Sequence, residues 1–516
     1  MANVSVFNTL FAKLPAATAT NNSAAPTYRY EPKHRLAQLV MTGCMNQTFY
    51  ADAEAQLSDV LTLARDLDSS FIAKTAVYSR ERGHMKDMPA LLVAVLAAKG
   101  APEFAAAFER VIDNGKMLRN FVQIVRSGAT GRKSLGSRPK KLVQAWLNKA
   151  SEQQLLQAAV GNSPSLADVV KMVHPKPTEP WREAFFAWLI GKSFDVAALP
   201  PLTRSLLAMR AGEGEALPAV PFQLLSNETL SAEQWAVVAE RMGWQALRMN
   251  LNTLARNGVF KIPAMSQKIA RRLSDPAAVA KARVFPYQLL AAYNTVSDDV
   301  PRVVKDALQD ALDQALSNVP ALEGNVVVCP DVSGSMRSAV TGVRKGATTN
   351  VRCIDVAALV AAALLRKHKD ARVLPFEVRV VNIQLNPRDS VLTNAQKLAA
   401  IGGGGTNCSA PLAQLVKENA TVDTVIMVSD NESWVDKTRR GATETMMQWE
   451  LIKRRNPNAK LVCIDIQPYG NTQAQERDDI LNVGGFGDAV FDVMAQFANG
   501  SFGAGHWVEA IDAMKL

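Results

Sequence analysis

Residues 325–337, NVVVCPDVSGSMR, decide the fold of the C-terminal part of the chain. The valine run is typical of a buried strand, and it leads into a loop that carries Asp331, Ser333 and Ser335. A carboxylate and two hydroxyls on one tight loop are hard oxygen donors, the ligands that Mg²⁺ prefers. The stretch therefore predicts a strand that ends at a site for a divalent cation.

Two later segments carry the oxygens that would complete this site. Thr406 follows the glycine run 402–405, and Asp430 ends the apolar run TVIMVSD. Sites in open α/β sheets lie at the carboxyl edge of the strands, so we expect all three segments at that edge. Strand-to-loop turns are rich in Asp, Ser and Thr in any case, but the order of the three segments favours a Mg²⁺ site.

Strand-like and helical runs alternate from residue 321 to residue 516. In chain order they are VVVCP, IDVAALVAAALLRKH, RVLPFEVRVVNI, NAQKLAAI, APLAQLVKEN, TVIMVSD, TETMMQWELIKRR and KLVCIDIQ. Such alternation predicts an α/β, Rossmann-like domain with a parallel sheet. The glycine run lacks the Lys-Ser/Thr of a phosphate-binding loop, so we interpret it as the backbone that presents Thr406.

The first 320 residues show a different sequence pattern. Residues 1–27 include the low-complexity stretch PAATATNNSAAPT and are expected to form a flexible tail. From residue 28 to residue 320, apolar residues recur at three- and four-residue spacing between short Gly/Pro/Asn breaks. This pattern predicts an all-α domain of HEAT-like helical repeats, with an irregular helical bundle as the alternative.

The net charge of +10 lies entirely in the helical part of this 516-residue chain. Residues 1–320 carry 37 Lys and Arg against 27 Asp and Glu, whereas residues 321–516 carry 21 of each kind. A local basic surplus indicates a polyanion partner, most plausibly nucleic acid, although basic runs are also common on solvated surfaces. The candidate contacts in RSGATGRKSLGSRPKK are Arg126, Arg132, Lys133, Arg138, Lys140 and Lys141. Weaker candidates in YSRERGHMKD are Arg80, Arg82, His84 and Lys86.

Several classes of protein are disfavoured. No run of about 18 apolar residues is present, and the N-terminus lacks the pattern of a secretion signal. The five cysteines are scattered without a C-x-x-C pair, which suits a cytoplasmic protein and excludes a cysteine-rich zinc site. The five histidines suggest no nucleophile–base set, and two acids with three hydroxyls fall short of a paired-metal nuclease. We therefore expect no enzyme.

The order Asp331, Ser333, Ser335, Thr406 and Asp430 resembles the metal-ion-dependent adhesion site of von Willebrand factor A domains. The resemblance implies one divalent cation, normally Mg²⁺, with a position left open for an acidic group of a partner.

Both parts of the chain together resemble the Ro autoantigen family, whose N-terminal module is called TROVE. The segments that carry the resemblance are RLAQLVMTGCMNQTFYADAE, RERGHMKDMPALLVAVLA, RMGWQALRMNLNTLARNG, VFPYQLLAAYNT, GGGGTNCSAPL, VSDNESW and RDDILNVGGFGDAVFDVMAQF. It implies a ring of helical repeats, closed by the A domain, that binds small noncoding Y RNA outside and single-stranded 3′ ends inside. We expect RNA rather than DNA as the partner of a cytoplasmic monomer. It further implies a role in RNA quality control, maturation or decay, with polynucleotide phosphorylase tethered through the RNA.

The resemblance adds Lys171, His174 and Lys176 of KMVHPKPT as RNA contacts, although a lone histidine more often packs or caps a helix. The sequence departs from animal members in two places. The preceding segment QQLLQAAVGNSP has no basic residue, and Asn407 follows Thr406 where animal members have Asp. The alternative interpretation is an A-domain module for protein contacts, cochelatase-like or adhesion-like, without an RNA role.

Overall fold

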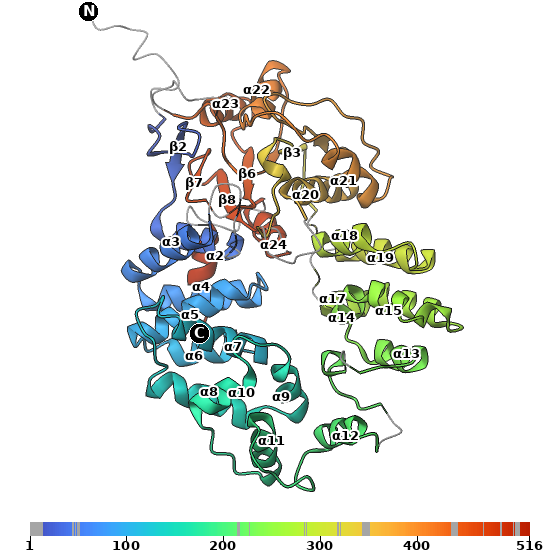
Figure 1. The fold of residues 1–516 in the computed structure, drawn as a ribbon. Coiled ribbons are helices and arrows are strands. Elements are labelled where there is room, and N and C mark those ends of the chain that lie inside the picture. Colours follow the sequence, from blue (N-terminus) through green and yellow to red (C-terminus); the bar gives the residue numbers. More distant parts are fainter. Residues whose placement is uncertain are drawn as a thin grey trace, which may run out of the picture. The chain divides into compact units, whose positions relative to one another are not determined.

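The computed structural model describes most of the chain, and it divides into two compact units (Figure 1). One unit comprises Met1–Leu67, Ser274–Thr295 and Asp306–Met514, and the other comprises Asp68–Leu273, Val296–Lys305 and Lys515–Leu516. The described residues are 14–43, 46, 48, 52–213, 217–225, 228–282, 284, 286–316, 319, 321–342, 351–434, 442–467, 469–485, 488–498, 500 and 506–516.

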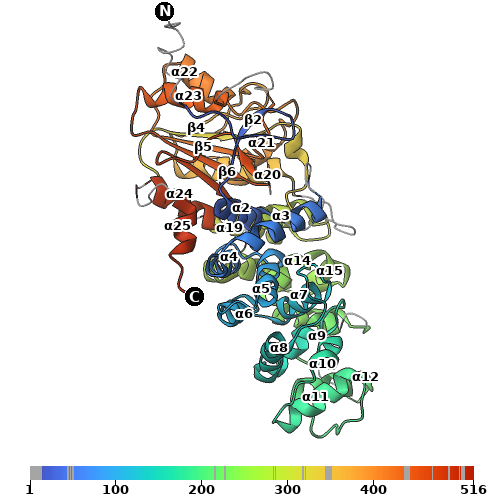
Figure 2. The ribbon, with the colours of Figure 1, turned by 90° about the vertical axis from the view of Figure 1, so that its left-hand side faces the viewer.

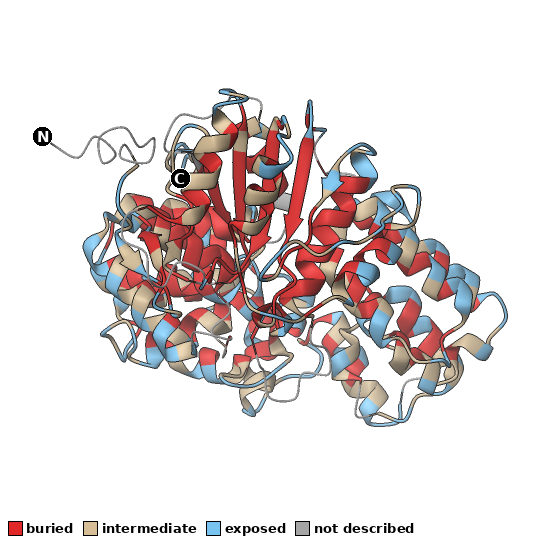
Figure 3. Cartoon of the chain, turned by 90° about the horizontal axis from the view of Figure 1, so that it is seen from above, coloured by how far each residue is buried: buried red, intermediate tan, exposed pale blue. Residues whose placement is uncertain are grey.

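The first unit is built on a five-stranded parallel sheet in the order β4-β3-β5-β6-β8 (Figure 2). The strands are β3 (Val326–Pro330), β4 (Arg372–Val373), β5 (Thr424–Ser429), β6 (Lys460–Asp465) and β8 (Ile480–Gly484). The central strands β3 and β5 are buried along their whole length, as expected for a parallel sheet with both faces covered. Figure 3 shows the long strands of the sheet as buried. The predicted α/β domain is confirmed.

Helices cover this sheet. The helices after β3 are α20 (Cys353–Lys367), α21 (Val391–Ala399), α22 (Ala410–Lys417), α23 (Glu444–Lys453), α24 (Asp488–Ala498) and α25 (His506–Asp512). Alternate strand residues such as Val425 and Leu461 pack in one core with Leu412 of α22 and with Met446 and Trp449 of α23. Helix α20 packs against β3, and α24 packs against β6 and β8. The unit also holds α2 (Pro32–Thr42), α3 (Ala53–Asp66), α17 (Pro276–Ala282) and α18 (Pro286–Thr295), and α19 (Arg302–Ala315) enters it at Asp306.

The expected flexible tail is wrong for its described part, residues 14–27. Strands β1 (Ala19–Thr20) and β2 (Pro26–Arg29) form a hairpin, and β2 pairs antiparallel with β7 (Asn471–Thr472). Tyr28 of β2 is buried in the same core as Trp449. A low-complexity composition predicted disorder, but burial of this tyrosine against the sheet domain supplies the contact that orders the segment.

Two strands differ from the expectation. Of RVLPFEVRVVNI only β4 is a strand, although pairing with β3 continues at Phe376, whose N–H donates to the Pro330 carbonyl at 3.1 Å. The chain then turns back, and the Val381 N–H donates to the Pro375 carbonyl at 2.7 Å. Strand β8 was not predicted, since its sequence ILNVG places a polar residue, Asn482, in a buried position. Asn482 is accommodated there by hydrogen bonds with Thr472 and Ala474.

The second unit is helical, as its spacing predicts. Its longer helices are α4 (Ser69–Glu81), α5 (Asp87–Lys99), α6 (Phe104–Val111), α7 (Gly115–Arg126), α8 (Ser137–Lys149), α9 (Glu152–Ala159), α10 (Leu166–Val173), α11 (Pro180–Ile190), α12 (Pro201–Arg210), α13 (Ala232–Arg241) and α16 (Met265–Leu273). Two shorter helices are α14 (Trp244–Met249) and α15 (Leu251–Arg256). Helices near in sequence pack together, for example α4 with α5 and α10 with α11, in the manner of helical repeats. Ser151, Ser165 and Ser231 start three of these helices with capping boxes.

Candidate metal centre and nucleic-acid interface

The loop after β3 gathers the first three predicted metal ligands. Asp331 is fully buried, its Oδ1 accepts a hydrogen bond from the Ser333 N–H at 2.8 Å, and its Oδ2 accepts one from the Ser429 hydroxyl at 2.6 Å. The hydroxyl oxygens of Ser333 and Ser335 lie 3.3 Å apart. One carboxylate and two hydroxyls therefore converge, as the sequence predicts.

Backbone hydrogen bonds join the Thr406 loop to the first loop and to the loop after Asp430. Gly334 N–H donates to the Gly404 carbonyl at 3.0 Å, and the N–H of Trp434 donates to the Thr406 carbonyl at 3.2 Å. Asp430, at the end of β5, is 1% exposed, and the Ser335 hydroxyl hydrogen-bonds its carboxylate. The structure thus places all three loops at the carboxyl edge of the sheet and brings Asp430 next to Ser335.

The glycine run is needed for this approach. Gly404 has a φ of +73°, and a Cβ there would lie 2.0 Å from the Glu377 Oε2. A residue with a side chain at this position would meet backbone strain, whereas the Glu377 carboxylate could move aside, so the positive φ is the reason that glycine is favoured in this loop.

Three buried acidic side chains, Asp331, Asp430 and Glu432, lie at this carboxyl edge of the sheet, where burial makes their negative charges unfavourable. Burial and the nearby Asp430 raise the pKa of Asp331 to about 7, and the same two causes raise the pKa of Glu432 to about 7. Burial also raises the pKa of Asp430. Mutually repelling carboxylates beside hydroxyl oxygens fit a hard divalent cation. Among the described residues no group of three or more His, Cys, Asp or Glu side chains could hold a metal, so the candidate centre depends on its hydroxyls.

Sequence reasoning missed two members of this site. Ser429 binds the Asp331 carboxylate, and the Glu432 N–H donates to Asp430 Oδ1 at 3.3 Å. Both residues lie within two positions of Asp430, so a polar run at a strand end was the signal available.

We expect the free energy of unfolding of the metal-free protein to fall as the pH rises from about 4 to about 7. Unfolded carboxyls ionise near their ordinary pKa, whereas Asp331 and Glu432 in the folded protein hold protons up to about pH 7. The folded state binds more protons in this window, so the loss is on the order of a few kcal/mol. Urea denaturation in EDTA at about pH 5 and about pH 7.5 measures it. The size-matched variant Asp331→Asn should weaken the dependence of the unfolding free energy on pH. A pH dependence equal to that of the wild type would contradict this explanation.

Three of the predicted RNA-contacting arginines bind backbone carbonyls or a carboxylate in the helical unit, and a fourth, Arg126, contacts the Met172 sulfur. Arg132 donates to the Ala97 carbonyl at 2.9 Å, and Arg138 donates to the Ala101 carbonyl at 2.8 Å, both near the end of α5. Arg80 forms a salt bridge with Asp113 at 2.8 Å. These guanidinium groups hold the repeats together, so their charges are less available to a ligand than the sequence suggested.

Other predicted contacts remain on the surface. Lys133, Lys141 and Lys176 are exposed, Lys140 is half-buried, and none of them forms an ion pair among the described residues. Arg126 and Lys171, from α7 and α10, line one hollow of about 570 Å³ together with Asp168. Asp168 is already engaged with the Ser165 hydroxyl, which is the main cause of its lowered pKa.

The remaining candidates lie at helix ends. His174 is exposed and ends α10 in the left-handed conformation with a φ of +51°, so it has the capping position that a lone histidine favours. Arg82 ends α4, His84 has a φ of +51°, and Lys86 starts α5. Burial, followed by Lys116 and Arg80, lowers the pKa of Lys86.

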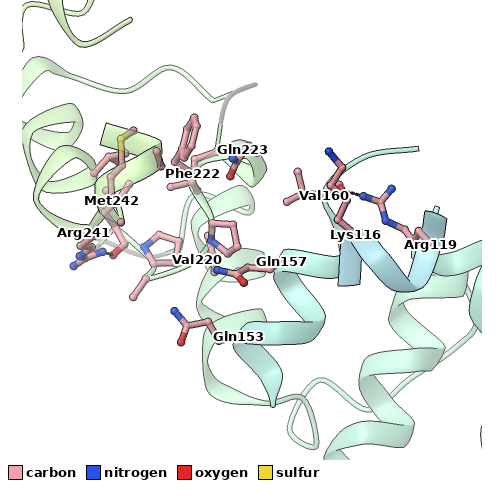
Figure 4. Close-up of a pocket in the computed structure, with 18 residues that line it drawn as sticks. Lys116, Arg119, Gln153, Gln157, Val160, Val220, Phe222, Gln223, Arg241 and Met242 are labelled. Carbon is pink, nitrogen blue, oxygen red and sulfur yellow. Dashed lines mark hydrogen bonds between the residues drawn. The ribbon is translucent and has the colours of Figure 1, made fainter. Parts of the chain in front are cut away.

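A second pocket of the helical unit, of about 620 Å³, was not predicted from the sequence (Figure 4). Its polar lining comprises Lys116 and Arg119 of α7, Gln153 and Gln157 of α9, and Arg241 of α13, with Gln223. The apolar lining comprises Val160, Leu217, Pro218, Ala219, Val220, Pro221, Phe222, Leu225, Val238, Met242 and Ala246. No acidic residue is among the described residues that line it. Cations, amides and an aromatic ring suit a nucleotide, because they match its phosphate, its base edge and its base face.

None of the described helices is both long and apolar enough to cross a membrane. Cys329, Cys353, Cys408 and Cys463 are buried free thiols, and Cys44 lies outside the described residues.

Comparison with known proteins matches both parts of the chain. The family model of the TROVE domain matches residues 141–358, and that of the Ro60 vWA domain matches residues 325–498. The chain is 28% identical to the RNA-binding protein RO60 of Deinococcus radiodurans over 514 residues, which cover 93% of this chain and 95% of that protein. It is 21% identical to the RNA-binding protein RO60 of Caenorhabditis elegans over 285 residues, which cover 50% of this chain and 42% of that protein. The fold is similar to the crystal structure of the Deinococcus radiodurans RO (RSR) protein, with a TM-score of 0.64, 24% identity, and coverage of 92% of this chain and 100% of that chain.

Proposed function

This chain belongs to the Ro family, since it carries both a TROVE domain and a Ro60 vWA domain, and from that premise we propose that it is a non-catalytic RNA-binding protein. The observation that carries the proposal is the hollow between Arg126 and Lys171, two cations 45 residues apart in sequence that line one concave surface of the helical unit. Paired cations in a hollow bind phosphates without reading bases.

Structured RNA is the proposed ligand of this outer basic surface. Lys133, Lys140 and Lys141 extend the charge along the segment before and in α8, and Lys176 extends it beyond α10. By the family resemblance this RNA is a small noncoding Y-like RNA that tethers polynucleotide phosphorylase for RNA maturation or decay. The predicted ring of helical repeats and the cytoplasmic location belong to the same proposal.

The 620 Å³ pocket is the proposed place for a nucleotide of a single-stranded 3′ end. Lys116 is exposed, and Arg119 donates to the Val160 carbonyl at 2.6 Å, so its guanidinium is held at the border of the pocket. Phe222 offers an aromatic face, and stacking on such faces tolerates any base. The pocket would thus accept RNA ends of varied sequence, as quality control requires.

The sheet domain would hold one Mg²⁺ through Asp331, Ser333, Ser335, Thr406 and Asp430. Bound there, the ion would supply positive charge at an otherwise acidic edge. Only two ligands are charged, so the ion keeps attraction for an acidic group of a partner. Trp434, which is 39% exposed, follows Asp430 closely in sequence and hydrogen-bonds the Thr406 loop, so it adds an aromatic surface for that partner.

The full-length protein should bind an RNA hairpin that carries a single-stranded 3′ extension more tightly than the blunt hairpin. Lys116→Ala should weaken binding of the extended RNA several-fold, because it removes a phosphate contact, and should leave the blunt hairpin unaffected. Fluorescence anisotropy at several salt concentrations measures both affinities.

The matched control is Lys192→Ala, an exposed lysine of the same unit that lines none of the pockets described above. Failure to bind either RNA at low salt would favour the A-domain protein-interaction alternative. Mg²⁺-dependent cleavage of the RNA that disappears in Asp331→Ala would instead identify a nuclease.

A further inference from the structure

We propose that the N-terminal hairpin, residues 19–29, is an outer part of the metal centre, in which Asn21 and Asn22 position the loop 429–434 for the cation. This inference rests on the proposed Mg²⁺ site and goes beyond it, since none of the predicted ligands lies in the first 300 residues of the chain.

Asn22 forms two hydrogen bonds with the side chain of Glu432. Its side-chain Nδ2 donates to Glu432 Oε1 at 2.9 Å, and its backbone N–H donates to Glu432 Oε2 at 3.0 Å. Both oxygens of a carboxylate that is only 1% exposed are therefore held by one residue from the other end of the chain. A buried carboxyl group needs hydrogen-bond partners, and Asn22 supplies a donor to each oxygen of Glu432.

Glu432 is itself hydrogen-bonded to Asp430, one of the predicted metal ligands. Its backbone N–H donates to Asp430 Oδ1 at 3.3 Å. Asn22 thus orients Asp430 through one intermediate residue, which is the relation that outer groups have to ligands in metal sites.

Asn21 makes a parallel link to the Thr406 loop. Its side chain donates to the Ser433 carbonyl, and the Ser433 hydroxyl accepts a hydrogen bond from the Cys408 N–H at 3.4 Å. Cys408 lies two residues after Thr406, so the two asparagines reach two of the three ligand loops.

The hairpin is itself well constrained. The Asn21 Oδ1 accepts hydrogen bonds from the N–H groups of Ser23 and Ala25, each at 3.0 Å, and Tyr28 of β2 pairs with Thr472 of β7. Asn21 is 6% exposed. The turn of the hairpin is hydrogen-bonded to the loop 429–434, and its strand β2 pairs with β7 of the sheet domain. The hairpin can therefore hold the loop 429–434 in a fixed position.

Titration of the full-length protein with Mn²⁺, followed by the electron paramagnetic resonance signal of the free ion, tests the proposal. Asn22→Ala should weaken Mn²⁺ binding about tenfold, in the range seen when an outer partner is lost. Ser23→Ala, which removes a neighbouring hydroxyl of the same turn, should bind Mn²⁺ as the wild type does. In EDTA, Ser23→Ala should melt at the temperature of the wild type, whereas Asn22→Ala should melt slightly lower because one buried Glu432 oxygen loses its donor, so Mn²⁺ affinities are compared well below both transitions.

A pair of substitutions separates positioning from a general loss of structure. Asn22→Asp sets two carboxylates against each other and should weaken Mn²⁺ binding more than Asn22→Ala does. Adding Glu432→Gln to Asn22→Asp exchanges donor and acceptor at the same contact and should restore most of the affinity. Equal Mn²⁺ affinity of the wild type and Asn22→Ala, or no recovery in the double variant, would overturn the inference. Absence of Mn²⁺ binding by the wild type would instead overturn the proposed metal site.

Discussion

Replacing Asp331 with alanine is expected to abolish divalent-cation binding, with a loss in affinity of more than about 100-fold. Asp331 is one of two carboxylates among the five predicted ligands, and its oxygens also orient Ser333 and Ser429. Its removal takes away half of the ligand charge and leaves the Ser333 N–H and the Ser429 hydroxyl without this acceptor. Isothermal titration with Mg²⁺ and Mn²⁺ measures the loss.

Two further variants control this experiment. Asp331→Asn retains the size of the side chain, so it should fold like the wild type and still fail to bind the cation. Asp465→Asn changes a buried aspartate at the end of the neighbouring strand β6, whose Oδ1 accepts a hydrogen bond from Gln467, and should leave cation binding intact. Retained binding in Asp331→Asn, or its loss in Asp465→Asn, would place the cation elsewhere.

Neutralising Lys133, Lys140, Lys141 and Lys171 together should weaken RNA binding about tenfold or more near physiological salt. Each lysine that contacts a phosphate releases a counterion, so losing four contacts should lower the slope of log Kd against log salt by about three. The melting temperature should stay unchanged, because none of the four side chains forms an ion pair among the described residues. Anisotropy titrations across a salt series give both quantities.

The arginines of the same segment make the comparison informative. Arg132 and Arg138 bind the carbonyls of Ala97, Ala101 and Pro102, so replacing them should destabilise the helical unit by about 1–3 kcal/mol each. Wild-type affinity and salt slope in the lysine variant would show that this surface does not bind RNA.

Local pattern was enough to predict most of the sheet domain. The valines before Asp331 and the apolar run before Asp430 are central parallel strands, and their carboxyl ends meet because parallel strands share one direction. The positions of the Asp331 and Asp430 loops follow from that rule. The Thr406 loop lies between α21 and α22, and the hydrogen bond from the Gly334 N–H to the Gly404 carbonyl brings it to the first loop. The short β4 and the missed β8 show its limit, since the chain turns back soon after β4 and hydrogen bonds with Thr472 and Ala474 stabilise Asn482 in β8.

The basic segment shows a different limit. The sequence displays Arg132, Lys133 and Arg138 as equivalent charges, yet two of them bind backbone carbonyls and one is free for solvent. Charge is a property of the residue, whereas its availability depends on which acceptors the fold brings within reach.

By itself the sequence determined the two fold classes, the confinement of positive charge to the helical part, and the five oxygen donors of the candidate metal site. These features depend on periodicity, composition and the order of the loops, all of which can be read directly from the sequence. Only the tertiary structure decided that residues 19–29 join the sheet domain and that Asn22 holds Glu432, 410 residues away. The physical reason is that a hydrogen bond depends on distance in space, and no local pattern marks which of many polar residues will meet once the core has formed.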